Sequence, residues 1–323
     1  MNKAEISPLM LGTWAFAKDQ SWGPQDDTLS IKTVHAALDA GLNAFDSAPA
    51  YGDGESERIL GKALQRRREA AYVATKVSPR DLRGKDLVAS CEASLKRLKT
   101  DRIDLLQVHW PNHDLPPGES IEALEELKSS GKAVAYGACN FGPQDLRAWL
   151  EAGAALQTNQ VAYSLLARAI EYAVLPDCRK EKIGILPYSP LMQGLLTGKF
   201  LGPDDVPDAR ARSRHFSKDR PAARHGETGC EDLTFATIDR IRRIAAEAGL
   251  PMEGMALAWL LRQPGVTSTI VGARSPEQLH KNRQALELQL DSTVVEALTA
   301  CTEELKHALG PNPDLWDTSG RIQ

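Results

Sequence analysis

The sequence of 323 residues lacks the marks of a membrane, secreted or nucleic-acid-binding protein. No apolar run approaches the roughly 18 residues of a membrane span, and no continuous apolar segment follows Lys3 and Glu5, so we expect neither a span nor a signal peptide. The five cysteines are odd in number and form no CxxC pair, which predicts reduced thiols in a cytoplasmic protein. The net charge is −4 without a basic patch, so nucleic acid is not an expected partner.

Polar residues recur at the ends of short apolar runs. They are Asp46, Lys76, His109, Asn140, Gln160 and Tyr188, and 20 to 33 residues separate each from the next. A βαβ unit takes about 30 residues. One polar residue per unit, placed just after the strand, would lie on one rim. In a parallel (β/α)8 barrel the C-terminal rim carries the active site, so the pattern predicts a fold and a site together.

The alternation of strands and helices predicts an α/β fold, a (β/α)8 TIM barrel. We expect a single domain over residues 1–323, because no low-complexity linker divides the chain, with a barrel core at about 9–290 and a C-terminal tail at about 291–323. A doubly wound open sheet is the alternative, but it would normally carry a nucleotide motif at its first strand–helix turn. Gly52-Asp53-Gly54 continues with Glu57 where the third glycine should be.

Apolar periodicity gives the expected elements. Strands are predicted at 9–13, 42–45, 71–75, 103–108, 133–138, 156–158, 183–186 and 268–271. Helices are predicted at 30–39, 56–64 with Ser56 as N-cap, 86–98, 146–152, 170–181 with an interruption at Pro176, 233–248, 252–261 and 276–286, and another is marked by Ile121, Leu124 and Leu127. After the seventh strand, residues 202–229 form a long loop without periodicity, and such loops are usually functional lids or disordered. Pro311 and Pro313 predict that the tail is a docked strap.

Six separated motifs occur around the polar residues. They are FDSAPAYG (45–52), ATK (74–76), DLLQVHWP (104–111), GACNF (137–141), NQVAYS (159–164) and PYSPLMQGLLTGK (187–199). Their order and spacing resemble the aldo-keto reductase superfamily from about Leu11 to Asn282, and in particular the bacterial branch with inositol- and sugar-oxidising members and general aldehyde reductases. The resemblance implies a TIM barrel that binds NADPH without a Rossmann fold and reduces aldehydes, 2-oxoaldehydes or sugars, or oxidises the corresponding polyols.

The resemblance also implies a catalytic set. Hydride transfer to a carbonyl builds negative charge on oxygen, so a proton donor must stand beside it, and Tyr51 is the family's acid by position. Lys76 would lower the pKa of Tyr51 from its free value of about 10, and Asp46 would pair with Lys76. His109, if neutral, would donate a hydrogen bond to the substrate oxygen. A metal pair of His109 and His113 is not expected, because Pro111 breaks any helix that would join them.

The cofactor residues implied by the resemblance lie in the later motifs. Asn140 and Gln160 would bind the nicotinamide carboxamide, and Tyr188 would stack on its ring. The stretch from Ser189 to Lys199 would follow the pyrophosphate, with contributions from Leu191, Gly194 and Leu195. This stretch is not a P-loop, because it is one residue short and continues with Phe200 in place of Ser or Thr.

A second cofactor anchor is expected in VGARSPEQLHKN, residues 271–282, which includes Gly272. Ser275, Pro276 and Gln278 indicate an N-cap, a first helical residue and a capping-box partner. Arg274 stands before this helix N-terminus, placed to bind a 2′-phosphate, which favours NADPH over NADH. Gln278 and Asn282 match family positions that bind adenosine. Two departures from the family are Cys139, where Ser is usual, and the neutral Gln278, where Lys or Arg is frequent.

An aromatic substrate pocket is expected from Trp14, Trp22 and Trp110, with Trp316 in the tail. The partner would be a small carbonyl or polyol substrate. Two other functions stay open at this point. Some barrels of this family serve as cofactor-sensing regulatory subunits of membrane channels with little turnover, and a metal-using barrel isomerase or lyase is a weaker alternative.

Overall fold

The computed structural model describes residues 6–19 and 21–323, in which eight parallel strands form one sheet. The strand order is β7-β6-β5-β4-β3-β2-β1-β8. The strands are β1 (Leu9–Gly12), β2 (Ala44–Asp46), β3 (Tyr72–Val77), β4 (Ile103–Val108), β5 (Ala133–Cys139), β6 (Thr158–Ala162), β7 (Gly184–Tyr188) and β8 (Thr269–Gly272). The outer strands of this order meet at Ile185, whose backbone exchanges hydrogen bonds of 2.9 Å with Gly265 and Thr267. The predicted barrel is confirmed, and the open-sheet alternative is wrong.

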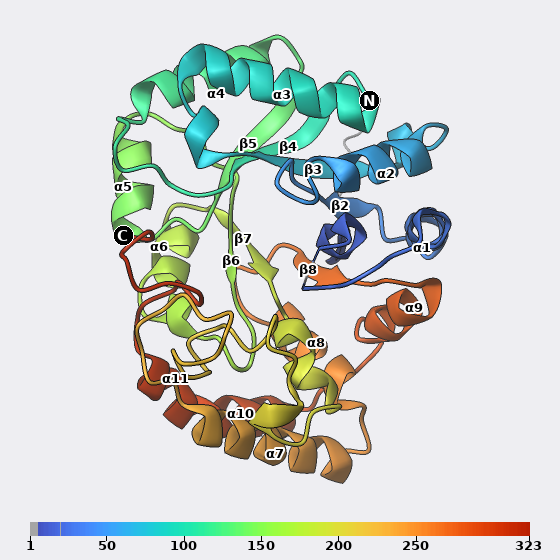
Figure 1. Ribbon diagram of the computed structural model, residues 1–323, viewed down its shortest axis with the longest axis vertical. Coiled ribbons are helices and arrows are strands. Elements are labelled where there is room, and N and C mark those ends of the chain that lie inside the picture. Colours follow the sequence, from blue (N-terminus) through green and yellow to red (C-terminus); the bar gives the residue numbers. More distant parts are fainter. Residues whose placement is uncertain (1–5, 20) are drawn as a thin grey trace.

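Helices surround the strands on all sides in Figure 1. They are α1 (Asp27–Asp39), α2 (Glu55–Leu64), α3 (Gly84–Leu98), α4 (Gly118–Ser129), α5 (Pro143–Glu151), α6 (Val174–Lys180), α7 (Glu231–Glu247), α8 (Met252–Leu261), α9 (Pro276–Gln284), α10 (Ser292–Cys301) and α11 (Glu303–Leu309). The main hydrophobic core lies between helices and strands. A second, small cluster of buried residues comes from six of the strands, and its members are Met10, Ala44, Ala74, Leu105, Leu186 and Ile270. Burial on both faces is the rule for parallel sheets, and it leaves the strand ends free to carry a site.

Two predicted boundaries are wrong because buried polar residues belong to elements that hydrophobicity alone does not show. β6 covers Thr158–Ala162, so Gln160 and its neighbour Asn159 lie inside the strand. Asn159 is satisfied there, since its Nδ2 donates to the Phe141 carbonyl at 2.8 Å. Ser56 does not cap α2, which follows Gly54 with a φ of 76°. The Ser56 hydroxyl is buried and donates to the Thr13 carbonyl at 2.9 Å.

Proline placement also differs from the sequence expectation at one site. The predicted helix at 170–181 is a short 3-10 turn (Ala169–Glu171) followed by α6, which begins at Val174. Pro176 therefore lies in the first turn of α6, where a missing backbone N–H leaves no helical bond unmade. Pro176 does not interrupt the helix, because the helix starts only two residues before it.

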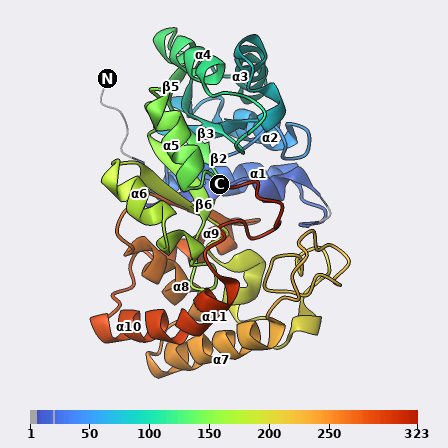
Figure 2. The same ribbon diagram turned by 90° about the vertical axis from the view of Figure 1, so that its left-hand side faces the viewer.

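The tail at 291–323 contains α10 and α11 and then a segment without helix or strand, residues 310–323, which we call the strap. Figure 2 shows the strap returning from α11 toward α5. It is docked, as predicted. The strap packs along the long loop at 202–229: Arg214 of the loop donates from its guanidinium to the carbonyls of Leu309 and Asn312 at 2.6 and 2.9 Å, and from its backbone to Leu315 at 2.8 Å. At the far end, Gln144 donates to the Gln323 carbonyl at 2.8 Å.

Within residues 6–19 and 21–323, no single helix is long and apolar enough to cross a membrane. Only α7 and α8 together reach the required length and hydropathy, and they are bent by 96° relative to one another. Most of the apolar residues of α8 are buried in the main core, which accounts for their composition.

Replacing Gly61 by alanine should destabilise the fold. A Cβ at Gly61 in α2 would lie 2.6 Å from the Leu98 carbonyl oxygen and 2.7 Å from that of Arg97, so α2 and α3 must move apart. We expect the free energy of unfolding to fall by about 1–3 kcal/mol, which urea denaturation measures. Gly118→Ala in α4 is the matched control, because a Cβ there meets no atom within 4 Å. Equal stability of the two variants would contradict the close approach of α2 and α3.

Candidate active site

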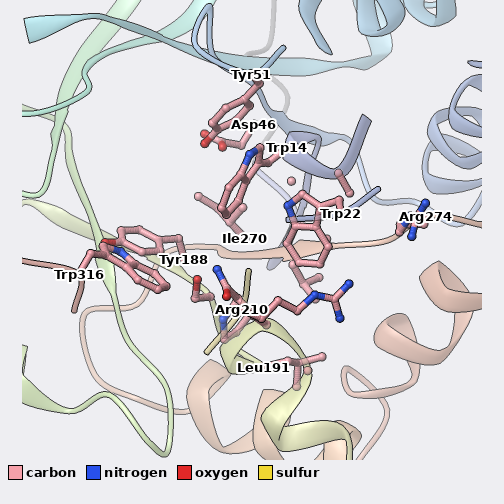
Figure 3. Close-up of a pocket in the computed structure, with 18 of the residues that line it drawn as sticks. Trp14, Trp22, Asp46, Tyr51, Tyr188, Leu191, Arg210, Ile270, Arg274 and Trp316 are labelled. Carbon is pink, nitrogen blue, oxygen red and sulfur yellow. The ribbon is translucent and has the colours of Figure 1, made fainter. Parts of the chain in front are cut away.

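A cavity of about 920 Å³ lies at the C-terminal ends of the strands. Its wall includes the ends of β1, β2, β4, β7 and β8, the long loop at 202–229 and the strap. Figure 3 shows Tyr51 and Asp46 on one side of it and Leu191 on the other, with Trp14 beside Tyr51, Trp22 beside Trp14, and Tyr188 next to Trp316. The rim predicted from the sequence therefore carries a cavity.

The Lys76 ammonium is the centre of a buried polar group at this rim. Lys76 and Asp46 come from the neighbouring strands β3 and β2 and are 1% and 2% exposed. The ammonium donates to both Asp46 oxygens at 2.8 and 2.9 Å and to the Ser47 carbonyl at 2.9 Å. It also donates to the Tyr51 hydroxyl at 3.2 Å. Residues from two strands and the following turn thus converge on one cation.

The charges of this group fix its protonation. Burial alone would lower the pKa of Lys76, but the Asp46 carboxylate, together with Tyr51 and Cys139, outweighs burial and holds that pKa above its usual value. Burial raises the pKa of Tyr51 to about 12, although Lys76 acts in the opposite direction. The expected net lowering of the Tyr51 pKa is therefore wrong. The main reason is burial of the Tyr51 hydroxyl, which disfavours the phenolate more than the Lys76 charge favours it, and the Asp46 charge acts in the same direction as burial.

His109 follows β4 and faces Tyr51. The two rings are 6.1 Å apart between centroids and nearly perpendicular, at 83°. Burial lowers the pKa of His109 to about 3, and the Lys76 charge acts in the same direction. The imidazole is therefore neutral at neutral pH, as the expected role requires. His113 lies on a separate network, where its Nε2 is 2.7 Å from an Asp145 oxygen.

Asn140 and Tyr188 are tied to each other, and Gln160 is tied to Asp46. Asn140 has a φ of 60°, which lies in the left-handed region. Its Oδ1 accepts from the Tyr188 hydroxyl at 2.9 Å, and its Nδ2 donates to the His109 carbonyl at 3.1 Å. Gln160 donates to Asp46 at 2.8 Å. All three residues line the cavity, and Gln160 has the additional part of holding the Asp46 carboxylate.

The segment after β7 turns through an unusual backbone path. Ser189, Met192 and Gln193 have φ values of 53°, 45° and 53°, and Gly194 has 104°. Ser189, Leu191, Gly194 and Lys199 line the cavity as predicted positions, while Leu195 is buried in the main hydrophobic core instead. Gln193 also lines the cavity, and both polar atoms of its amide are buried without a hydrogen-bond partner among the described residues. Such atoms point to a polar ligand.

The N-terminus of α9 forms the opposite end of the cavity. Ser275 caps it, accepting from the Gln278 backbone at 3.3 Å. The Gln278 side chain accepts from the Arg274 backbone at 2.8 Å, so it is not the capping-box partner of Ser275. Asn282 donates to the Gly272 carbonyl at 3.1 Å. The Arg274 guanidinium donates to the Gln25 side chain at 3.0 Å. Gly272, Arg274, Gln278 and Asn282 all line the cavity.

Three cations gather near this end without a carboxylate partner in the described part of the chain: Lys199, Arg210 and Arg274. Burial lowers the pKa of Arg210, and Arg274 lowers it further. Burial likewise lowers the pKa of Lys199, and Arg210 adds to the effect. The mutual repulsion makes this end of the cavity a site for an anion.

The three predicted tryptophans lie in the cavity wall together with Trp316 of the strap. Trp14 stacks on Tyr51, with centroids 6.1 Å apart and rings inclined by 26°, and contacts Trp22 edge-on at 5.5 Å. The Arg321 guanidinium lies 4.0 Å from the Trp110 ring centroid. Both the long loop and the strap therefore contribute side chains to the wall.

Comparison with known proteins identifies the family. Residues 8–303 match the model of the Aldo/keto reductase family. The chain belongs to this family. Aldo-keto reductase YhdN of Bacillus subtilis is 37% identical over 85% of this chain and 83% of its own length. NADH-specific methylglyoxal reductase of Escherichia coli is 33% identical over 92% and 96%. An aldo/keto reductase of Klebsiella pneumoniae, solved with NADP and acetate, is 27% identical with a TM-score of 0.73 and coverages of 98% and 95%.

In this aldo/keto reductase the strand-end residues were found from motifs, whereas several cavity residues were not. Arg210, Arg212 and Arg224 come from the long loop, and Gln193 comes from the segment after β7. The spacing of Arg210, Arg212 and Arg214 was an available signal, because three alternate arginines in a loop beside an active-site rim indicate an anion. No comparable signal indicated Gln193.

The pKa of about 3 at His109 predicts a neutral ring over the whole accessible pH range. Two-dimensional NMR of ¹⁵N-labelled imidazoles should show a single tautomer of His109 from about pH 5 to pH 9. In Lys76→Met the loss of the ammonium should raise the pKa of His109, while burial keeps it below the free value of about 6.5. Titration of the wild-type His109 near pH 6.5 would contradict the burial argument.

Proposed function

We propose that this aldo/keto reductase reduces the carbonyl of a small aldehyde or ketone to an alcohol with NADPH, and that Tyr51 supplies the proton. The observation that carries the proposal is the Tyr51 hydroxyl, which lies 3.2 Å from the buried Lys76 ammonium, next to His109, at the wall of a cavity of about 920 Å³. The reverse reaction, oxidation of an alcohol or polyol, would use the same groups. The E. coli relative, a methylglyoxal reductase, supports a small carbonyl substrate.

The cavity residues fit a nicotinamide dinucleotide with an additional phosphate. The buried, unpartnered amide of Gln193 offers hydrogen-bonding atoms, and Lys199, Arg210 and Arg274 offer positive charge for phosphates. Asn140 and the Tyr188 ring would hold the nicotinamide. The Klebsiella relative solved with NADP supports this choice, and the NADH-specific E. coli relative supports NADH as the less favoured cofactor.

The bound cofactor would supply the hydride, and the residues of the chain would manage charge on the substrate oxygen. Tyr51 donates its hydroxyl proton to that oxygen as the charge develops. The Lys76 ammonium, 3.2 Å away, stabilises the phenolate that remains. The neutral His109 donates a hydrogen bond to the same oxygen and orients the carbonyl. Asp46 and Gln160 act on Lys76 and not on the substrate, because they hold the ammonium in place.

The pKa of about 12 at Tyr51 determines how the rates of the forward and reverse reactions depend on pH. A phenol with that pKa is protonated, which is the form that a reduction needs. Oxidation of an alcohol needs the phenolate as base, and the phenolate population grows with pH. We infer that reduction is the faster direction at neutral pH, with oxidation gaining as the pH rises.

Tyr51→Phe should abolish most turnover and leave cofactor binding intact. The change removes the proton donor and keeps the ring against Trp14, so kcat for aldehyde reduction should fall about 10²–10⁴-fold. NADPH consumption followed by absorbance with a panel of aldehydes and sugars measures turnover, and fluorescence titration measures the Kd for NADPH. Equal turnover in both proteins would contradict the role of Tyr51. Tight NADPH binding by the wild type without turnover of any carbonyl would favour the regulatory-subunit function instead.

Arg274→Met should change cofactor preference. Arg274 stands at the N-terminus of α9, where its guanidinium lines the cavity, and we propose that it binds the 2′-phosphate. A charged hydrogen-bonding partner is worth about a tenfold to hundredfold change in affinity, so the KM for NADPH should rise by that factor while the KM for NADH stays the same. Arg274→Lys keeps the positive charge but loses the paired N–H donors of the guanidinium, so its KM for NADPH should lie between those of the wild type and Arg274→Met. Equal losses for NADPH and NADH would contradict the assignment.

A further inference from the structure

A second set of cations lies in the cavity wall and is not needed for the cofactor phosphates. Arg212 and Arg224 of the long loop both line the cavity. The Arg212 guanidinium carbon lies 5.5 Å from the ring centroid of Trp14 and 5.1 Å from that of Trp316. It therefore connects the loop to two aromatic walls, one from the β1 side and one from the strap.

The arginines of this loop divide according to whether they face the cavity. Arg214 is bound by Glu227 at 2.9 Å, and Arg220 by Glu231 at 2.7 Å, and neither lines the cavity. Arg212 and Arg224 line it and have no ion pair or hydrogen bond to any described residue, and the Nε of Arg212 is buried. A partly buried guanidinium without a partner is costly, so the arrangement indicates that its partner is a ligand.

The neighbouring groups leave Arg212 free for that ligand. Asp19 is the acid whose charge raises the pKa of Arg212. The Asp19 carboxylate already accepts from Trp14 Nε1 at 2.6 Å and from the Ser21 backbone at 2.9 Å. Arg321, the other cavity arginine near these aromatic rings, is bound by Asp314 at 2.8 Å. Arg212 is therefore an available cation, as Arg224 is, whereas Asp19 and Arg321 beside it are occupied.

The position of Arg212 points to the substrate more than to the cofactor. Trp14, which Arg212 contacts, also stacks on Tyr51, the proposed proton donor. Arg210 contacts a different indole, Trp22, at 5.0 Å. Burial lowers the pKa of Arg212, and the charge of Arg224 lowers it further. The pKa of Arg210 is lowered by burial and by the charge of Arg274 instead. Two separate cationic sets thus serve one cavity, and Arg212 belongs to the one beside the proton donor.

We propose that the carbonyl substrate carries an anionic group, a carboxylate or a phosphate ester, which Arg212 binds together with Arg224 while the carbonyl faces Tyr51. The proposal rests on the proposed function and adds the substrate class. Contact with the two indoles restrains the guanidinium, and its N–H groups, which have no partner among the described residues, suit an oxyanion. The anionic group takes no part in the reaction, because only the carbonyl carbon and oxygen change.

Matched substrate pairs test the proposal. 4-Oxobutanoate is compared with its methyl ester, and glyceraldehyde 3-phosphate with glyceraldehyde, so that each pair shares its aldehyde and differs in charge. We expect the wild type to prefer the anionic member by at least about tenfold in kcat/KM. The pair with the larger preference tells which oxyanion fits, and either result supports the proposal. Equal kcat/KM within both pairs would overturn it.

Variants separate a specific contact from a general effect. Arg212→Met should lower kcat/KM about tenfold to hundredfold for the preferred anionic substrate and by less than about threefold for its neutral partner. Arg212→Lys should recover part of the loss. Arg243→Met on the exposed face of α7 is the matched charge control and should change neither. Equal losses for both members of a pair, or a weaker Kd for NADPH in Arg212→Met, would overturn the proposal.

If the proposed function is wrong, the wild type reduces neither member of either pair. In that case a binding experiment alone tests the anion site. Succinate, an unreactive dicarboxylate, should change the tryptophan fluorescence of the NADPH-bound wild type, because Arg212 contacts Trp14 and Trp316. Arg212→Met should not respond. If the wild type shows no fluorescence response, or if both proteins respond equally, the anion site is overturned, whether or not the protein reduces carbonyls.

Discussion

The buried ion pair between Lys76 and Asp46 is the interaction on which the rest of this site depends. Two opposite charges inside a barrel are stable only when both are fully hydrogen-bonded, and here Gln160 and the Ser47 carbonyl complete the set. Removing one partner of such a pair costs about 3–5 kcal/mol, because the other charge stays buried. The pair sets the charge beside Tyr51 and helps to keep His109 neutral, so stability and proton chemistry have the same source.

The barrel and its loops contribute different parts of the cavity. Asp46, Lys76 and His109 stand at the ends of adjacent strands, where backbone pairing between β2, β3 and β4 fixes their spacing. Three of the cavity cations, Arg210, Arg212 and Arg224, come from the long loop, and Lys199 and Arg274 come from segments that follow β7 and β8. In physical terms, the rigid sheet holds the groups whose separation must be accurate to a hydrogen-bond length, and the connecting segments determine the charge and shape of what enters.

The sequence predicted the barrel because each strand ends in a polar residue at the interval of one βαβ unit. It predicted Asp46, Lys76 and His109 as neighbours for the same reason, and the resemblance to the aldo-keto reductases added Tyr51. It could not predict the direction of the Tyr51 pKa, which depends on how deeply the hydroxyl is buried beside the charges of Lys76 and Asp46. It missed Arg212, because the alternate arginines of the long loop indicate an anion but not which of their side chains face inward. It placed β6 too early, because buried amides such as Asn159 have the same composition as a turn.

The contact between the long loop and the strap has a consequence for how the protein can change over evolutionary time. Arg214 of the loop is bound to three backbone groups at and beyond the end of α11, and Arg212 contacts Trp316 of the strap. The long loop and the strap, which form two walls of the cavity, are therefore in direct contact along one line, which we call the seam. A substitution that reshapes the loop disturbs the strap, and the reverse holds as well. Among homologues, residues on the two sides of this seam should covary, so that new substrate preferences arise by paired changes while the barrel sequence stays the same.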